Sequence, residues 1–190
     1  MADSLSKMLH YAAIACMLIG LGLVSSAAYI QTKAELAQLL IARAYRLQSA
    51  TNEPQKPWPW ADTSVIAKLI IKQHTDYVLA DASMRNLAFG PTHMSHTSVP
   101  GSYGNSVIVG HRDTHFEKLK DIQLGEIIQI EREGIRIHYR VAETAIVHES
   151  DVAVSAQLDA SALTLITCYP FNSVAANPEL RYVVRAIKET

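Results

Sequence analysis

Three residues in this chain carry side chains that together could perform acyl transfer. Cys168 ends the pentapeptide TLITC, Arg181 follows it thirteen positions later, and His111 lies upstream in the tripeptide GHR. A thiol can act as a nucleophile, an imidazole can carry protons, and a guanidinium can donate hydrogen bonds to an oxyanion. The three residue types therefore predict catalysis through a thioester, provided that folding brings them together.

The segments around the cysteine and the histidine predict that both lie at the ends of strands. Cys168 follows the run LTLIT, which has strand character, and comes shortly before Pro170, which cannot continue regular pairing. His111 follows SVIVG, a second strand-like run whose terminal glycine lets the backbone turn. Two strand ends could thus present the imidazole and the thiol side by side.

Short β-branched runs between turn signals predict seven or eight strands, which is typical of a β-sandwich or β-barrel. In IRIHYRV the apolar residues alternate with polar ones, so one face of that strand should be buried. In RYVVRAI, Arg181 should share a face with Val183 and Arg185. A short helix is expected over residues 81–87 with Asp81 as its N-cap, followed by a loop through GPTHMSHTSVPGSYGN. The predicted strands are residues 65–71, 77–80, 106–109, 126–130, 135–141, 163–167 and 181–187.

Composition limits the classes of function. The chain has 190 residues, 49% of them hydrophobic, which is enough for one globular domain. Its 17 basic and 18 acidic residues nearly cancel, so no nucleic-acid partner is predicted. Cys16 lies in an apolar segment far from Cys168, so a disulfide is not expected. The alternative for a lone cysteine such as Cys168 is a small buried core residue.

The N-terminal segment predicts a membrane anchor. Residues 11–30 contain no charged side chain, and about 20 such residues can cross the hydrocarbon core of a bilayer. Apolar residues keep helical spacing over residues 31–49, as if the helix continued, and the proline-rich TNEPQKPWPW then ends it. The alternative is a cleaved secretory signal, because Ser25-Ser26-Ala27 resembles a cleavage site.

Two features of the sequence make conflicting predictions of how the anchor is oriented in the membrane. Lys7 is the only basic residue before the apolar segment, whereas Lys33, Arg43 and Arg46 follow it, and simple counting places the C-terminal side in the cytoplasm. Long folded domains are translocated largely regardless of such charges. The predicted chemistry favours export of the domain.

Several motifs resemble those of the sortases, which are cysteine transpeptidases of bacterial surfaces. The resemblance is carried by TLITC with its arginine, by NSVIVGHRDTHFEKL, and by LAFGPTHMSHTSVPGSYGNSVIVGH, and it extends over about residues 58–188. The segment PWPWADTSVIAKLII after the anchor resembles the proteobacterial branch of that family. The resemblance implies an all-β fold with a closed eight-stranded barrel and short helical inserts. It also implies cleavage of an LPXTG-like sorting signal with transfer of the acyl group to an amine.

The resemblance assigns roles residue by residue. Cys168 matches the nucleophile, His111 the general acid or base, and Arg181 the arginine that stabilises the oxyanion or positions substrate. Thr167 matches a position that lines the substrate groove, and Tyr169 stands where some relatives have an acidic residue. No organic cofactor is implied. Some relatives respond to calcium through acidic loop residues, but residues 88–104 contain no carboxylate, so no metal requirement is expected.

The expected organisation has three segments. Residues 1–30 are a cytoplasmic tail and membrane anchor, residues 31–57 a juxtamembrane helix and proline-rich linker, and residues 58–190 the catalytic barrel. The location is the inner membrane, crossed once, with the catalytic domain in the periplasm. The expected partners are a surface or secreted protein with an LPXTG-like C-terminal signal, an amine acceptor and the inner membrane.

Two alternative activities remain at this stage. The sequence HRDTH places His111, Asp113 and His115 at alternate positions, a donor set that suits zinc and would indicate a zinc hydrolase. An L,D-transpeptidase-like or cysteine hydrolase activity would also pair cysteine with histidine on a β-rich scaffold. The latter family places the two residues within one short signature, whereas here they are 57 positions apart.

Overall fold

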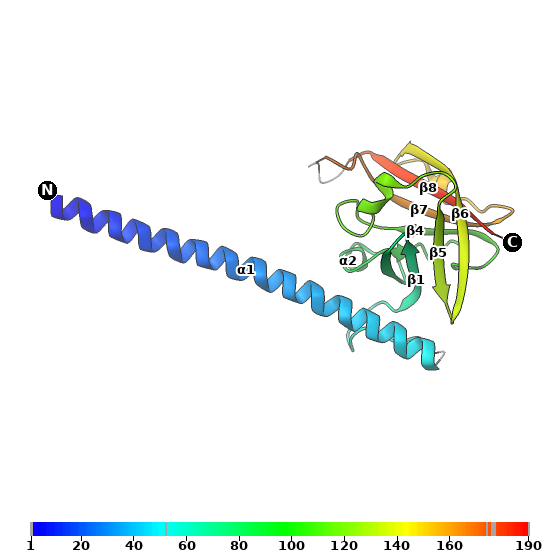
Figure 1. Ribbon diagram of the computed structural model, residues 1–190, viewed down its shortest axis with the longest axis horizontal. Coiled ribbons are helices and arrows are strands. Elements are labelled where there is room, and N and C mark those ends of the chain that lie inside the picture. Colours follow the sequence, from blue (N-terminus) through cyan, green and yellow to red (C-terminus); the bar gives the residue numbers. More distant parts are fainter. Residues whose placement is uncertain (1, 52, 174, 176–177, 190) are drawn as a thin grey trace. The chain divides into compact units, whose positions relative to one another are not determined.

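The computed structural model describes residues 2–51, 53–173, 175 and 178–189. The chain divides into two compact units, Met1–Leu39 and Leu40–Thr190. A single helix, α1 (Ala2–Thr51), begins in the first unit and ends in the second (Figure 1). It ends shortly before Pro54, which has no backbone donor for a further helical turn.

Residues 13–24 of α1 are apolar on all sides of the helix. Large hydrophobic side chains are exposed at successive positions around the helix, among them Met17, Leu18, Leu21 and Val24. By length and composition this helix can cross a membrane. A helix that is hydrophobic all round is typical of a buried or membrane environment.

Eight strands close into a barrel in the second unit, which confirms the predicted fold class (Figure 1). Their order around the barrel is β1-β2-β3-β4-β7-β8-β6-β5. Closure pairs every strand on both sides and removes free sheet edges. The strands are β1 (Val65–Ile71), β2 (His74–Leu79), β3 (Thr92–His93), β4 (Gly104–Val109), β5 (Ile127–Arg132), β6 (Ile135–His148), β7 (Ser161–Tyr169) and β8 (Leu180–Lys188).

The core fills the barrel interior. In β1 buried residues strictly alternate with partly exposed ones, as expected for a strand with one inward face. Phe116, Leu119 and Ile122, in and around the 3₁₀ helix η1 (Glu117–Asp121), join the same core. The other buried members of this core are Ala67, Leu69, Ile71, Val78, Ile108, Ile128, Ile130, Tyr139, Val141, Leu163, Leu165, Val184 and Ala186.

Strand β6 runs seven residues beyond its predicted end at Val141 because it contains a β-bulge. The pairing of β6 with β8 shifts between Val141 and Glu143. Before the shift, Tyr139 and Val141 face the core, and after it Glu143 lies opposite Arg185, whose side chain it binds. The extra residue of a bulge reverses which side chains face the core. The alternating pattern of apolar residues in the sequence is therefore interrupted at the bulge, and the predicted strand ends there.

Two local predictions were wrong. The short helix α2 covers only Met84–Leu87, and its N-cap is Ser83, whose hydroxyl accepts a hydrogen bond from the Asn86 amide. Asp81 instead has a positive φ of 62° in the preceding turn. The expected loop after this helix contains β3, which pairs with β2 and β4, and the first two residues of β4. A second 3₁₀ helix, η2 (Val152–Ser155), follows β6.

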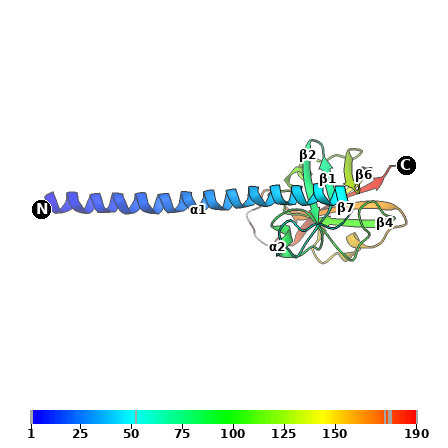
Figure 2. The same cartoon turned by 90° about the horizontal axis from the view of Figure 1, so that it is seen from below.

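The last turns of α1 belong to the second unit and pack on the barrel (Figure 2). Ile41, Ala44 and Tyr45 form a buried cluster with Val65 of β1 and Leu79 of β2. The Tyr45 hydroxyl donates to the Glu131 carbonyl oxygen at 3.0 Å. Burial, together with the nearby Glu131 charge, raises the pKa of Tyr45 to about 12.

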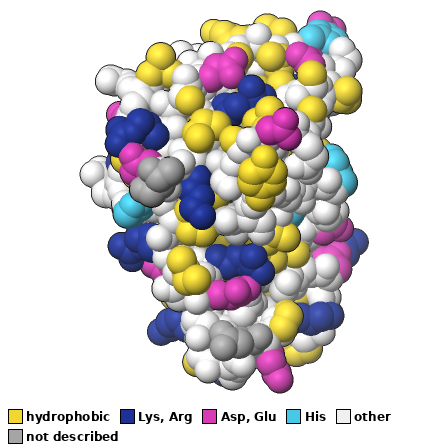
Figure 3. Space-filling model, turned by 90° about the vertical axis from the view of Figure 1, so that its right-hand side faces the viewer, with side chains coloured by type: hydrophobic (Ala, Val, Ile, Leu, Met, Phe, Trp, Pro, Cys, Tyr) yellow, Lys and Arg dark blue, Asp and Glu magenta, His cyan; other side chains and the backbone are white. Residues whose placement is uncertain are grey.

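The charges on the molecular surface are mixed. On the face shown in Figure 3, Lys and Arg side chains alternate with Asp and Glu side chains, and neither sign forms a continuous patch. This distribution agrees with the near-zero net charge of the sequence.

Candidate functional site

The C-terminal ends of β4 and β7 lie side by side. These two strands pair in parallel, and their last paired residues are Val109 and Ile166. Beyond this pair the Gly110 amide donates to the Ile166 carbonyl at 3.1 Å, and the Thr167 hydroxyl donates to the Gly110 carbonyl at 2.8 Å. His111 follows Gly110 and Cys168 follows Thr167, so these contacts bring the backbone that leads from β4 to the histidine next to the part of β7 that carries the cysteine.

Cys168 is the direct cross-strand neighbour of Arg181. β7 and β8 are antiparallel, and the two residues are partners in their register. Side chains directly opposite each other on one face of such a pair have Cβ atoms about 4.5–5.5 Å apart. Cys168 is a free cysteine and is only partly buried, so it is not the small core residue that the alternative interpretation required.

The face that carries Cys168 is the outer face of the barrel, and its floor is apolar. Strand alternation places Cys168 on the same side as Ile166. Ile166 forms a small cluster with Val107 of β4 and Val183 of β8. Leu165 and Val184, which adjoin Ile166 and Val183 in the sequence, face the barrel core instead. Other side chains packed against this outer cluster are Met94, Val109, Val147 and Val154.

A hollow continues from this apolar floor beneath η2. Its volume is about 260 Å³, and it lies along the outer face of β6 and β8. Val147, Val154 and Val183 belong both to the hollow and to the apolar floor, and Arg185 and Glu143 line it farther from Cys168. The apolar floor itself, formed by Val107, Ile166 and Val183 on the face that carries Cys168, offers the contact surface for an aliphatic side chain.

His111 is held through its backbone, and its imidazole is exposed. The Phe116 amide donates to the His111 carbonyl at 3.0 Å. Gly110 permits this turn because a Cβ atom there would come within 2.9 Å of the buried Phe116 ring. Within the described part of the chain, neither the imidazole of His111 nor the thiol of Cys168 has a hydrogen-bond partner, so both are free to meet a substrate.

Two nearby backbone carbonyls and one carboxylate hold the guanidinium of Arg181. Nη1 donates to the carbonyl oxygens of Pro178 and Leu180, at 2.6 and 3.0 Å. Nη2 donates to Oε2 of Glu149 at 2.7 Å. Arg181 shares its face of β8 with Val183, which belongs to the apolar floor, whereas Val184 faces the core. This is the alternation that the sequence predicted for the strand.

Arg112 is a residue of this region whose contacts sequence reasoning missed. Its side chain is 6% exposed. Nη1 donates to the Pro170 carbonyl at 3.0 Å, and Nη2 donates to the carbonyls of Ser173 and Ala175 at 2.6 and 2.7 Å. The residue after the candidate histidine thus holds the loop after the candidate cysteine. The only sequence signal was the position of Arg112 next to His111, which does not reveal its partners.

A partly buried group of charges ties the segment after His111 to the β1–β2 hairpin. Nδ1 of His115 lies 2.9 Å from Oδ1 of Asp76, and the Lys118 ammonium contacts the other carboxylate oxygen. Burial would raise the pKa of Asp76, but the hydrogen bonds from His115 and Lys118 and the charge of Lys118 together lower it below its ordinary 3.8. The three residues line a polar cavity of about 500 Å³.

The HRDTH pattern does not form a metal site. His115 is bound to Asp76, and Asp113 accepts a hydrogen bond from Nε of Arg112 at 3.1 Å. In the ranges that the structure describes, no group of three histidine, cysteine or acidic residues is arranged to hold a metal ion. The zinc hydrolase alternative therefore has no converging donor set.

Thr167 is more deeply buried than we expect for a residue that lines a substrate groove. It is 2% exposed, and its hydroxyl is used by the Gly110 carbonyl. Its side chain points to the opposite side of β7 from Cys168. Its visible function is to hold the end of β4 against the end of β7.

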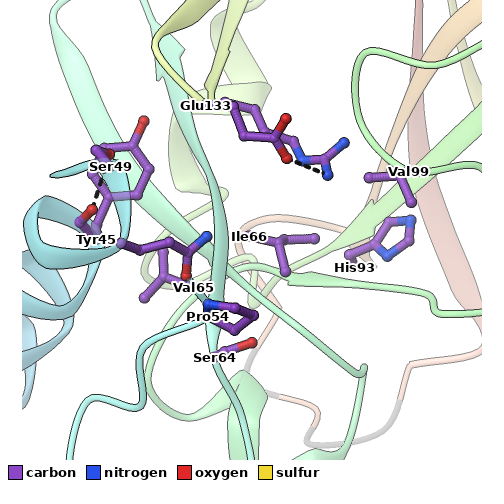
Figure 4. A pocket seen from close by; sticks show the side chains of 11 residues that line it. Tyr45, Ser49, Pro54, Ser64, Val65, Ile66, His93, Val99 and Glu133 are labelled. Carbon is purple, nitrogen blue, oxygen red and sulfur yellow. Dashed lines mark hydrogen bonds and ion pairs between the residues drawn. The ribbon is translucent and has the colours of Figure 1, made fainter. Parts of the chain in front are cut away.

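Another pocket, of about 260 Å³, lies between the end of α1 and the barrel wall (Figure 4). Tyr45, Val65, Ile66 and His93 line it. His93 was expected in a surface loop but is buried, with Nε2 2.9 Å from the Ser98 carbonyl. The pocket adjoins the N-terminal end of β1. Strand directions place that end of the barrel opposite the end with Cys168.

Comparison with known proteins agrees with this geometry. The sortase domain model matches residues 69–189, well over half of the chain. The chain therefore belongs to the sortase family. This result favours the sortase interpretation over the L,D-transpeptidase-like alternative.

One relative matches this chain in sequence, and two solved structures share its fold. Sortase D of Bacillus subtilis (strain 168) is 30% identical over 100 residues, which cover 52% of this chain and half the length of that relative. A sortase D5 transpeptidase of Clostridium perfringens superimposes with a TM-score of 0.67 at 21% identity, over 81% of this chain and 99% of that one. Sortase A of Corynebacterium diphtheriae has a TM-score of 0.62 at 27% identity, with coverages of 69% and 63%.

Proposed function

We propose that this protein is a membrane-anchored cysteine transpeptidase with Cys168 as nucleophile, His111 as proton carrier and Arg181 as oxyanion donor. The observation that supports the proposal is the alignment of three strand ends. Cys168 lies opposite Arg181 in the β7–β8 register, and the Thr167–Gly110 hydrogen bond joins the residue before Cys168 to the residue before His111. These are the nucleophile, acid–base group and oxyanion donor that acyl transfer requires.

In the first half-reaction the Cys168 sulfur, with its proton transferred to His111, attacks the scissile carbonyl of a sorting signal. The carbonyl π electrons move to oxygen, and the Arg181 guanidinium donates hydrogen bonds to this oxyanion. The tetrahedral intermediate collapses, the C–N bond breaks, and the leaving amine takes a proton from His111. The products are a thioester on Cys168 and the free C-terminal fragment.

In the second half-reaction an amine acceptor attacks the thioester. Neutral His111, left after its proton transfer, accepts the proton of the attacking amine. The C–S bond breaks, a new amide forms, and the proton held by His111 passes to the sulfur, which regenerates the thiol. The exposed position of His111 lets both the leaving amine and the acceptor reach it from the same side.

The substrate we infer is a surface or secreted protein with an LPXTG-like C-terminal signal. The apolar floor of Val107, Ile166 and Val183 supports this assignment, because it offers an aliphatic contact next to the thiol. Thr167 belongs to the site by holding β4 against β7, and it contributes to the shape of the groove through that contact.

We infer that α1 anchors the domain in the inner membrane and that the barrel faces the periplasm, as in the proteobacterial branch that the segment after the anchor resembles. Residues 1–30 then form the tail and anchor, residues 31–57 the stalk and linker, and residues 58–190 the catalytic part. An alkaline phosphatase fused after Thr190 should be active in cells. Activity of a cytoplasmic reporter at that position would contradict the orientation.

The decisive experiment is mass spectrometry of the full chain in detergent after incubation with a library of LPXTG-like peptides. We expect an adduct with the mass of the peptide's N-terminal acyl part, mapped to Cys168, and its discharge on addition of an amine. Cys168→Ala is the control. An adduct on another residue, or none with any peptide of the library, would refute the proposal.

Catalysis should need no divalent metal. Residues 88–104, the segment in which some relatives carry acidic calcium ligands, contain no carboxylate here. Transpeptidation in buffer with excess chelator should equal that in calcium-containing buffer. Complete loss in chelator that calcium restores would contradict this prediction.

A further inference from the structure

We propose that Glu149 is a positioning residue for Arg181 that holds the guanidinium in the orientation needed for acyl transfer. This inference rests on the proposed function. Glu149 directly follows β6, just beyond Val147, the residue paired with Arg181. Its amide donates to the Glu179 carbonyl at 2.7 Å, and its carboxylate accepts from Nη2 of Arg181 at the same distance.

The pattern of contacts shows why one carboxylate determines the orientation. Both backbone carbonyls that Arg181 contacts, those of Pro178 and Leu180, bind the same nitrogen, Nη1. Glu149 is the group that binds Nη2. Without it the guanidinium would be held at one corner and could pivot about Nη1. With it, the planar group is fixed at two corners, and since no acceptor among the described residues binds the Nε–H, that donor is left for a substrate oxygen.

The ion pair is too exposed to be explained by stability. The Arg181 side chain is 27% exposed and the Glu149 side chain 48% exposed. Exposed pairs of this kind contribute little to the free energy of unfolding. Fixing a flexible donor before the substrate binds, in contrast, removes an ordering cost from the reaction itself.

The chain contains a matched control on the same two strands. Glu143 of β6 binds Arg185 of β8 at 3.0 Å, with side-chain exposures of 55% and 23%. The Arg185 position in β8 pairs with Thr164, four residues before Cys168 in β7. Removing Glu143 therefore removes a similar ion pair from the same sheet without touching Arg181.

The test measures kcat and KM for the peptide that acylates Cys168, using the full chain in detergent. Glu149→Ala should lower kcat about tenfold with little change in KM, because the donor is misplaced in the transition state. Glu149→Gln keeps an acceptor oxygen and should recover most of this loss. Glu143→Ala should leave both constants unchanged.

A double-mutant cycle separates positioning from other effects. In an Arg181→Ala background, Glu149→Ala should have no further effect, because Glu149 acts only through Arg181. Equal losses from Glu149→Ala and Glu143→Ala, a loss that persists without Arg181, or a rise in kcat in Glu149→Ala would each overturn the inference. A rise would mean that Glu149 holds the guanidinium away from the reaction.

Failure of this inference is distinguishable from failure of the proposed function. Severe loss in Arg181→Ala with none in Glu149→Ala refutes only the role of Glu149. If no peptide acylates Cys168, nitrogen-15 spectra of the Arg181 side chain still test positioning. Distinct Nη signals in the wild type that average in Glu149→Ala, but not in Glu143→Ala, would support it, and averaged signals in the wild type would refute it.

Discussion

At the scale of single residues, the role proposed for Cys168 rests on its neighbours. A lone cysteine is more often a small core residue than a nucleophile. Here the thiol lies on the outer face of β7, directly opposite Arg181, and next to the strand that leads to His111. Leu165, three residues earlier on the opposite face, is fully buried in the core. Successive side chains of a strand point to opposite faces, so Leu165 and Cys168, an odd number of positions apart, lie in different environments.

Substitutions at the candidate site should follow the proposed roles. Cys168→Ala should abolish the acyl adduct, because the other free thiol, Cys16, lies in the apolar segment of α1 away from the candidate site. Arg181→Ala should lower kcat about 100-fold to 1000-fold, the usual cost of losing one oxyanion donor. Arg181→Lys should recover little of it, because an ammonium cannot reproduce the planar fork. Rates from peptide cleavage measure these effects, and near-wild-type activity of Arg181→Ala would remove this residue from the mechanism.

At the scale of elements, the segment between β4 and β5 connects the site to the rest of the barrel. It begins at Gly110, carries His111 and Arg112, and places Phe116 over the core. Arg112 reaches across to three carbonyls of the loop between β7 and β8, so one buried side chain joins the histidine segment to the loop after the cysteine. The bulge in β6 also shapes this region, because it brings Glu143 and Val147 to the outer face of the sheet.

Arg112→Ala should loosen the loop that follows Cys168. The change leaves three carbonyl groups without their charged donor, so we expect a loss of about 2–4 kcal/mol in the free energy of unfolding. Hydrogen exchange should rise over residues 171–175 more than over β1. Urea unfolding and exchange mass spectrometry measure the two effects.

The control for Arg112 is Arg136→Ala, which removes a more exposed arginine bound to Glu131. It should cost less than about 1 kcal/mol. An equal cost for the two variants, with unchanged exchange in the loop, would show that Arg112 does not order this loop.

At the scale of the whole molecule, closure of the barrel places the polar groups of several strands at one end. The end of β1 and the start of β2 lie at the same end as Cys168, as the strand directions require. There Asp76 holds His115 and Lys118, and so anchors the segment that starts at His111. The stability of this end therefore depends in part on the charge of one partly buried carboxylate, Asp76.

Stability should fall in acid through Asp76. Its pKa is lower in the folded chain than the ordinary 3.8, so folding favours the ionised form. The resulting stabilisation is fully present above the ordinary value and is lost as the pH falls below it toward the lowered pKa. Thermal unfolding between pH 2 and pH 7 should show a smaller acid-induced fall for Asp76→Asn than for the wild type. Parallel curves would contradict the assignment.

The sequence by itself determined the local features. Period-two alternation and the positions of proline and glycine located seven of the eight strands, with β1 at its observed bounds, and placed Cys168 near the end of a strand. These signals are local, because the alternation of side chains follows from the backbone geometry of a single strand. The resemblance to sortases then supplied the closed barrel and the candidate residues.

Only the tertiary structure decided which strands pair and which side chains meet. The two-residue β3 is too short for any periodic signal, and the β6 bulge reverses the alternation that a sequence pattern needs. The contact of Thr167 with Gly110, the clamp by Arg112 and the pair of Arg181 with Glu149 join residues 32 to 63 positions apart. Alternation states which face is buried but not which partner covers it, and that choice is made by register and closure of the barrel.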